Sequence, residues 1–148
     1  MFVPIILGSE SDKEHAQKIA DQLSKFGIPY EIKVLSAHKV PEKLVAYVTE
    51  KNNEQEIVYV TIAGRSNGLS GCTSGSSVHP VIACPPFKDK DDYMVNVHST
   101  LQMPSDTPVM TILEPQNVAL SIARIFGLHD KELQQKVAAR IHEVKAQF

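Results

Sequence analysis

The sequence contains little cysteine and no tryptophan, and the shortage of cysteine limits what the chain can be. Only two cysteines occur among its 148 residues, Cys72 and Cys84, and they do not form a CxxC pair. A disulfide-stapled scaffold and a zinc knuckle are therefore disfavoured. So few cysteines are typical of a protein from a reducing compartment, and we expect a cytoplasmic protein.

Strong net charge and long apolar runs are also missing. The net charge is −2, which gives no overall field to attract nucleic acid or an anionic membrane. No apolar run approaches the roughly 20 residues that span a bilayer. No basic residues precede the first apolar run, so it does not read as a secretory signal. We expect neither a nucleic-acid partner nor a membrane.

What is present is the composition of an ordinary globular domain. Hydrophobic residues make up 43% of the chain and charged residues 22%, which is typical of a globular protein. At this length the chain is expected to form one domain over residues 1–148, with a buried core.

Strand-like runs alternate with helical patterns along the whole chain. The expected strands are residues 2–7, 30–34, 57–62, 81–84 and 109–113. This alternation predicts a three-layer αβα sandwich around a parallel sheet. The run 30–34 alternates polar and apolar residues, which suits an edge strand, so we predict a flavodoxin-like order of 2-1-3-4-5. An amphipathic segment, 130–147, adds a C-terminal helix to the core formed by residues 1–127.

Two local signals place the first helix. Ser11 followed by Glu14 three residues later matches a capping box. Gly27 follows the last apolar residue of the pattern and is expected to end the helix.

The most unusual stretch is residues 63–71, which reads AGRSNGLSG. It holds three glycines, which cost backbone entropy and suit a close approach to a ligand. Arg65 is the only Arg or Lys between Lys51 and Lys88. In the predicted topology this loop meets residues 8–12 and 36–41 at the switch point of the sheet, where ligands bind. We therefore predict a small-molecule site there.

The other two loops carry suitable chemistry, although each has a plainer explanation. Residues 8–12 (GSESD) offer hydroxyls and N–H groups at a helix start, which suits a phosphate; plain helix capping by Ser11 is an equal alternative. His38 can act as an acid or base near neutral pH, and Lys39 can neutralise a phosphate. A surface histidine and lysine are the plain alternative. The remaining histidines lack the spacing of a metal site, and we expect no metal.

Together these motifs resemble a known family. The matching stretches are 8–12 (GSESD), 26–29 (FGIP), 36–41 (SAHKVP), 63–69 (AGRSNGL), 80–86 (PVIACPP) and 101–104 (LQMP). They run in the order seen in the aminoimidazole ribonucleotide carboxylase (PurE) family of purine biosynthesis and cover most of the chain. The resemblance implies an enzyme.

The family has two branches, and the resemblance favours one. The bacterial mutase branch carries Ser-Ala-His-Arg in the second loop and a Gly-Ala-Ala-His-Leu run in the third. Lys39 and Gly68 stand in the corresponding places here, so the second histidine is absent. The sequence around Arg65 instead resembles the branch (class II) that carboxylates the ring directly with carbon dioxide. That branch needs no cofactor: no ATP, biotin or metal. The mutase remains the alternative.

The resemblance also implies roles for residues. His38 would be the catalytic acid and base. The residues expected to hold the substrate phosphate and ribose are Gly8, Ser9, Ser11, Asp12, Ser36 and Lys39. Those expected around carbon dioxide and the aminoimidazole are Ala63, Gly64, Arg65, Ser66, Asn67 and Gly68. The family forms ring-like homo-oligomers, so we expect an octamer ahead of a tetramer, with helix 130–147 packed on a neighbouring subunit.

Two alternatives from other classes stay open at this stage. A flavodoxin-like module could bind a flavin or nucleotide without catalysis. The 6% aromatic content and the absence of tryptophan argue mildly against the stacking walls that such a module needs. A structural subunit without a site would leave the three unusual loops unexplained.

Overall fold

The computed structural model describes residues 1–148 and has a five-stranded parallel sheet at its centre. The strands are β1 (Val3–Leu7), β2 (Tyr30–Val34), β3 (Tyr59–Ile62), β4 (Val81–Ala83) and β5 (Met110–Thr111). Their order is β2-β1-β3-β4-β5, and every neighbouring pair is parallel. The predicted sheet order is confirmed, with β2 at the edge.

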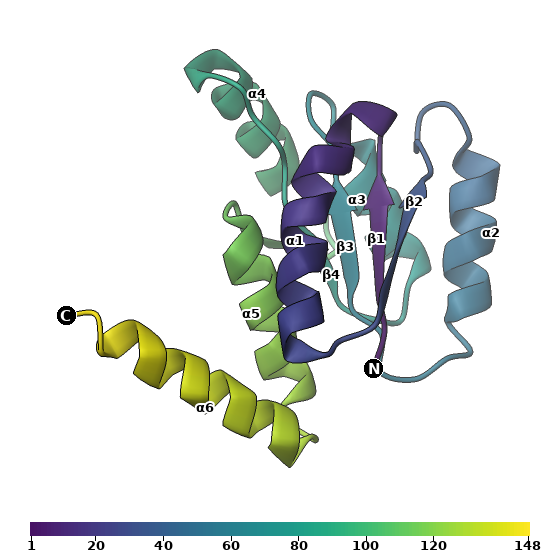
Figure 1. Cartoon of the computed structure of the whole chain (residues 1–148). Coiled ribbons are helices and arrows are strands. Elements are labelled where there is room, and N and C mark those ends of the chain that lie inside the picture. The colour runs from purple at the N-terminus through teal and green to yellow at the C-terminus, as the bar shows by residue number, and fades with distance from the viewer.

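Helices cover both faces of this sheet, as Figure 1 shows. They are α1 (Lys13–Phe26), α2 (Pro41–Lys51), α3 (Gly68–Ser76), α4 (Lys90–Leu101), α5 (Pro115–Phe126) and α6 (Lys131–Lys145). α1 packs beside α5 on one face, and α2 packs beside α3 on the other. The three-layer αβα architecture is therefore as predicted.

The interior strand β1 separates two apolar cores. Ile5 and Leu7 point to the side of α1 and α5 and join the larger cluster. Ile6 points the other way and packs with Leu44 of α2 and Leu69 of α3. Alternate residues of a strand face opposite sides of its sheet, which is why β1 must be apolar along its whole length.

Helix α1 forms where the apolar spacing predicts it, but the predicted capping box is wrong. Ser11 lies in a 3-10 turn, Glu10–Asp12, that precedes α1. The Ser9 side chain caps this turn by accepting a hydrogen bond from the Ser11 N–H, and the Ser11 hydroxyl donates to Ser9 as well. The turn moves the start of the helix to Lys13, beyond the reach of Ser11. Gly27 ends α1 in the left-handed region at φ +74°, as predicted.

Four strands, β1, β3, β4 and β5, are shorter than the apolar runs that predicted them. In the third run only Ile57 makes an isolated bridge before β3 begins at Tyr59. β5 keeps two residues of a predicted five. Burial of a segment does not require a ladder partner at every residue, so apolar runs overestimate strand length.

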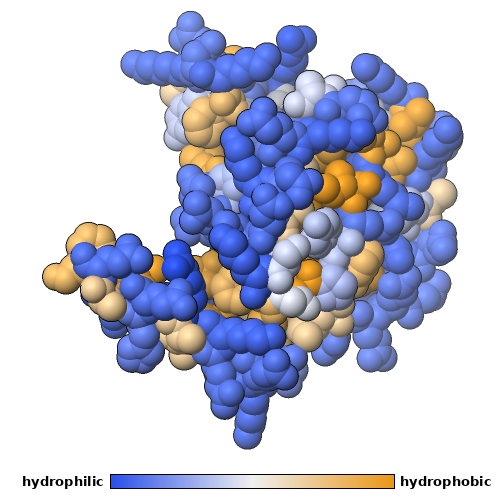
Figure 2. All heavy atoms as spheres, viewed as in Figure 1, coloured by the Kyte–Doolittle hydropathy of each residue, from blue (hydrophilic) through white to orange (hydrophobic).

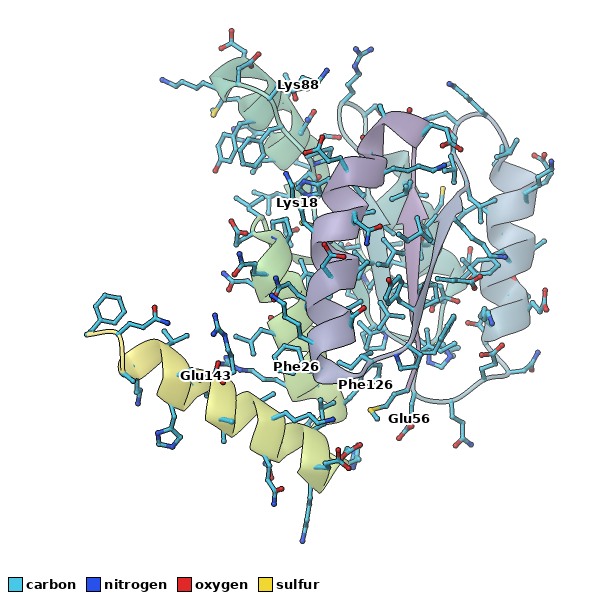
Figure 3. All side chains as sticks on the ribbon, in the orientation of Figure 1. Lys18, Phe26, Glu56, Lys88, Phe126 and Glu143 are labelled. Carbon is cyan, nitrogen blue, oxygen red and sulfur yellow. The ribbon has the colours of Figure 1, made fainter.

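Two helices extend beyond the sandwich. α4 rises past the carboxyl end of the sheet, and α6 leaves the domain at the opposite end (Figure 1). Leu133 and Val137 anchor the first half of α6 in the larger core, where Phe126 of α5 also packs and Phe26 of α1 lies alongside (Figure 3). Apolar atoms show at the free end of α6 in Figure 2, on a face that is otherwise mostly hydrophilic. No helix has the length and apolar content needed to cross a membrane.

Candidate active site

A cleft of about 740 Å³ opens at the carboxyl edge of the sheet, where the topology predicts a ligand site. All three predicted loops contribute to it. The predicted site residues that line it are Gly8, Ser9, Ser11, Asp12, Ser36, His38, Lys39, Ala63, Gly64, Arg65 and Ser66. The parallel strands bring these distant stretches to one edge because their carboxyl ends all face the same way.

The first loop brings a carboxylate and two hydroxyls to the cleft. The Gly8 N–H donates to the Ile62 carbonyl at 2.9 Å, and a Cβ on Gly8 would lie 3.3 Å from that of Ala63. Glycine thus lets the ends of β1 and β3 lie close together. Burial raises the pKa of Asp12, while hydrogen bonds with Ser9 and Ser11 and the charge of Lys88 act in the opposite direction.

The second loop presents His38 on a compact turn before α2. The Lys39 and Val40 N–H groups both donate to the Ser36 carbonyl, at 3.3 and 2.9 Å. This turn leaves the side chains of His38 and Lys39 exposed beside the cleft. The His38 ring lies against Gly68, whose missing Cβ would sit 3.1 Å from His38 Nε2.

The third loop is shorter than the glycine content predicts. Helix α3 begins at Gly68, and the buried Asn67 caps it by accepting a hydrogen bond from the Ser70 N–H. Asn67 and Gly68 therefore do not line the cleft. Asn67 instead supports the loop from behind, and Gly68 backs His38.

Sequence reasoning missed a fourth connection, between β4 and α4, and the first turns of α1. The additional lining residues are Glu14, His15, Lys18, Ala37, Leu69, Pro86, Phe87, Lys88, Asp92 and Asn96. The β4–α4 connection could have been found, because β4 neighbours β3 and ends at the same edge. Nothing in the sequence pattern marks the helical residues.

The cleft is rich in positive charge relative to the chain as a whole. Four cations line it, Lys18, Lys39, Arg65 and Lys88, against the carboxylates of Asp12, Glu14 and Asp92. Lys18 pairs with Glu14 at 3.5 Å, whereas the other three cations make no ion pair. Figure 3 shows Lys18 on α1 and Lys88 beside α4, on the same side of the molecule. Unpaired cations at one site favour an anionic ligand such as a phosphate.

A histidine–cysteine contact lies behind the α1 wall. His15 Nε2 is 3.2 Å from Cys84 Sγ. Burial, and then the nearby charge of Lys18, lowers the pKa of His15. Burial also raises the pKa of the Cys84 thiol to about 12, so Cys84 stays protonated and is not a nucleophile.

The geometry gathers an acid–base group, cations and a glycine-lined loop in one cleft. The described chain contains no cluster of three side chains able to hold a metal ion. An anionic small molecule could bind to the cations with its reactive part beside His38. This arrangement suits proton transfer on an anionic small molecule.

Comparisons with known proteins identify the family of the chain. The family model described as AIR carboxylase matches residues 2–147. The phosphoribosylaminoimidazole carboxylase of Treponema denticola is 46% identical over 137 residues, which cover 92% of this chain and 86% of that protein. The enzyme of the same name from Archaeoglobus fulgidus is 44% identical, with 93% and 75% covered.

A longer relative and a solved structure extend the comparison. The human bifunctional phosphoribosylaminoimidazole carboxylase/phosphoribosylaminoimidazole succinocarboxamide synthetase is 39% identical, and the match covers 94% of this chain but 33% of that protein. The crystal structure of Treponema denticola PurE superposes with a TM-score of 0.90 at 44% identity, covering 99% of this chain and 92% of that one. The chain therefore belongs to the AIR carboxylase family of enzymes.

Proposed function

We propose that this enzyme is a phosphoribosylaminoimidazole carboxylase. It adds carbon dioxide to a ring carbon of 5-aminoimidazole ribonucleotide and forms 4-carboxyaminoimidazole ribonucleotide in de novo purine (IMP) biosynthesis. The reaction uses no ATP and no cofactor, and the enzyme works in the cytoplasm. The observation that carries the proposal is the position of His38 in the cation-lined cleft of an AIR carboxylase fold.

The substrate phosphate and ribose bind to the first two loops. Lys39 makes no ion pair within the chain, so its ammonium is available to the phosphate. Ser9 and Ser11 of the first loop and Ser36 of the second supply hydroxyls, and Asp12 accepts hydrogen bonds from the sugar. Lysine acts as a point charge rather than as a bidentate fork. The hydroxyls and the backbone N–H groups of residues 8–12 therefore fix the orientation of the phosphate.

His38 moves the proton of the reacting carbon. The electron-rich ring carbon attacks carbon dioxide and a carbon–carbon bond forms. The electron pair of one C=O π bond moves onto its oxygen, which gives the carboxylate. The same ring carbon then carries both the new carboxylate and its original proton. His38 takes that proton, which restores the aromatic ring. In the reverse direction, His38 returns the proton and carbon dioxide leaves.

Residues 63–66 receive the carbon dioxide. The N–H groups of Arg65 and Asn67 are already bonded, to the side chains of Asn96 and Ser99. The N–H groups of Gly64 and Ser66 have no partner within the chain and are free for the oxygens of the developing carboxylate. Fixed N–H donors aimed at a growing negative charge stabilise a transition state.

Gly68 supports the direct use of carbon dioxide rather than the mutase reaction. The mutase branch carries a second histidine in the third loop. In this fold a side chain at Gly68 would enter the space of the His38 ring, because its Cβ would lie 3.1 Å from Nε2. The site therefore works with one imidazole at this position, which suits a reaction with a single proton to move.

The variant His38→Asn tests this role. Asparagine keeps a polar amide near the position of the imidazole Nδ1 but cannot exchange a proton near neutral pH. With aminoimidazole ribonucleotide and bicarbonate, kcat is expected to fall at least about 100-fold, while calorimetry shows nucleotide binding close to wild type. Turnover near the wild-type rate would remove His38 from the mechanism.

A further inference from the structure

A buried amide in the middle of α4 joins two walls of the cleft. Asn96 is only 2% exposed. Its Oδ1 accepts a hydrogen bond from the Arg65 N–H at 2.5 Å, and its Nδ2 donates to the Pro86 carbonyl at 2.6 Å. One side chain thus ties the β3–α3 loop to the β4–α4 loop, using both ends of its amide.

The backbone that Asn96 holds is an unfavourable one. Arg65 has φ +57°, in the left-handed region that residues with a Cβ avoid. Such a conformation persists only where the surroundings fix it, and it gathers at functional sites. The bond from the Arg65 N–H to Asn96 is a contact that fixes it here.

The neighbouring glycine fits the same interpretation. A Cβ on Gly64 would lie 2.9 Å from Asn96 Nδ2 and 3.2 Å from its Cγ. The amide therefore occupies the space that a side chain at position 64 would need. The loop and the amide pack directly against each other, with glycine as the residue that allows it.

The rest of the inner face of α4 supports the same loop. The Ser99 hydroxyl accepts a hydrogen bond from the Asn67 N–H at 2.7 Å. Asn67 Nδ2 donates to the Thr100 hydroxyl at 2.9 Å, and that hydroxyl donates back to the Asn96 carbonyl at 2.7 Å. Polar groups buried on this face are thus bonded to one another and to the loop, as buried polar groups must be.

We propose that Asn96 is a positioning residue that fixes residues 63–66, and with them the free N–H groups of Gly64 and Ser66. This deepens the proposed function and rests on it. Both ends of the Asn96 amide are engaged by protein, so it acts through the loop rather than on the substrate. The loops that hold the phosphate make no hydrogen bond to Asn96.

The variant Asn96→Ala tests the proposal. A loop displaced by about an ångström can cost roughly 100-fold in rate, so kcat is expected to fall at least about tenfold. The KM for the nucleotide should change far less, because Ser9, Ser36 and Lys39 keep their positions. Asn96→Asp keeps an acceptor for the Arg65 N–H but loses the Nδ2 donor and sets a buried carboxylate oxygen against the Pro86 carbonyl, so it should not restore the activity.

Asn52 provides a matched control. Its amide also bridges two backbone groups: Oδ1 accepts from the Val78 N–H at 3.1 Å, and Nδ2 donates to the Ser76 carbonyl at 2.8 Å. This bridge lies at the end of the sheet opposite the cleft. Asn52→Ala should therefore lower the melting temperature without changing kcat or KM.

Hydrogen exchange of the peptide covering residues 63–68 gives a readout that does not depend on activity. It should be faster in Asn96→Ala than in wild type or Asn52→Ala. A wild-type kcat in Asn96→Ala, or hydrogen exchange in that variant no faster than in wild type, would overturn the proposal. A wild-type enzyme without turnover would overturn the proposed function instead, and the exchange comparison would still decide whether Asn96 holds the loop.

Discussion

His38 and Gly68 show how much of this site depends on single residues. Gly68 opens α3 without a positive φ, so its backbone conformation does not require glycine. The reason for glycine is space: a Cβ there would lie 3.1 and 3.2 Å from two atoms of the His38 ring. Such contacts are tighter than ordinary van der Waals packing, and the ring would have to move.

The variant Gly68→Ala is expected to displace the His38 imidazole. Because an acid–base group must lie within hydrogen-bond reach of the proton it moves, we expect kcat to fall by about tenfold or more. The KM for the nucleotide should stay close to wild type. Steady-state kinetics at several bicarbonate concentrations measure both parameters.

Gly71→Ala is the control for this variant. It adds the same methyl group one turn further along α3, where the Cβ would lie 3.4 Å from Met103 Sδ, an ordinary contact. Helix propensity changes in the same direction in both variants. Equal kinetics in Gly68→Ala and Gly71→Ala would show that the space around His38 does not matter.

At the scale of elements, sequence periodicity predicted most of the fold. The apolar runs and the alternating pattern of β2 were enough for the sheet order and its two helical layers. They failed where tertiary contacts decide. Asn67 converts half of a glycine-rich stretch into the first turn of α3, and Ser9 displaces the start of α1 by forming a 3-10 turn.

The candidate site was predicted in the same uneven way. Topology identified three of its walls, because carboxyl ends of parallel strands share one edge. Asn96 escaped notice because its role comes from two loops that lie 31 and 10 residues away in sequence. No local pattern encodes such a bridge.

The contact of His15 in α1 with Cys84, the residue after β4, should make stability depend on pH. Burial lowers the pKa of His15 below its ordinary value of 6.5. The unfolded chain therefore binds a proton at His15 at a higher pH than the folded chain does. The contribution of His15 to stability is present above about pH 6.5 and is lost as the pH falls below it.

The variant His15→Gln removes this titration. Its free energy of unfolding should fall less than that of wild type between pH 7.5 and pH 5, measured by urea denaturation at each pH. The difference between the two proteins is the quantity that isolates His15, since other groups titrate in both. An equal or larger fall in the variant would contradict the assignment.

At the scale of the whole molecule, α6 is a helix whose second half leaves apolar side chains exposed in the single chain. Its first half packs on α5, but Val144 stays 39% exposed and Phe148 is fully exposed beyond it. We propose that a neighbouring subunit covers this second half in a homo-oligomer, with an octamer favoured over a tetramer. Light scattering should give eight times the 16.3 kDa chain mass.

The variant Val144→Glu tests the role of α6 in this assembly. A carboxylate placed in an apolar contact must be desolvated, which weakens the association. The variant oligomer is therefore expected to dissociate at a higher protein concentration than the wild-type oligomer. A monomeric mass for the wild-type protein would contradict the proposal. An unchanged mass for the variant would show that the contact between subunits does not involve this part of α6.

The central claim is that carbon dioxide is added directly to the ring. The most direct measurement offers the purified enzyme two substrates in parallel, without ATP: aminoimidazole ribonucleotide with bicarbonate, and the isomer already carboxylated on its exocyclic amine. The claim predicts formation of the ring-carboxylated nucleotide from the first, at a rate proportional to enzyme and abolished in His38→Asn. Conversion of the amine-carboxylated isomer alone would contradict it and make the enzyme a mutase.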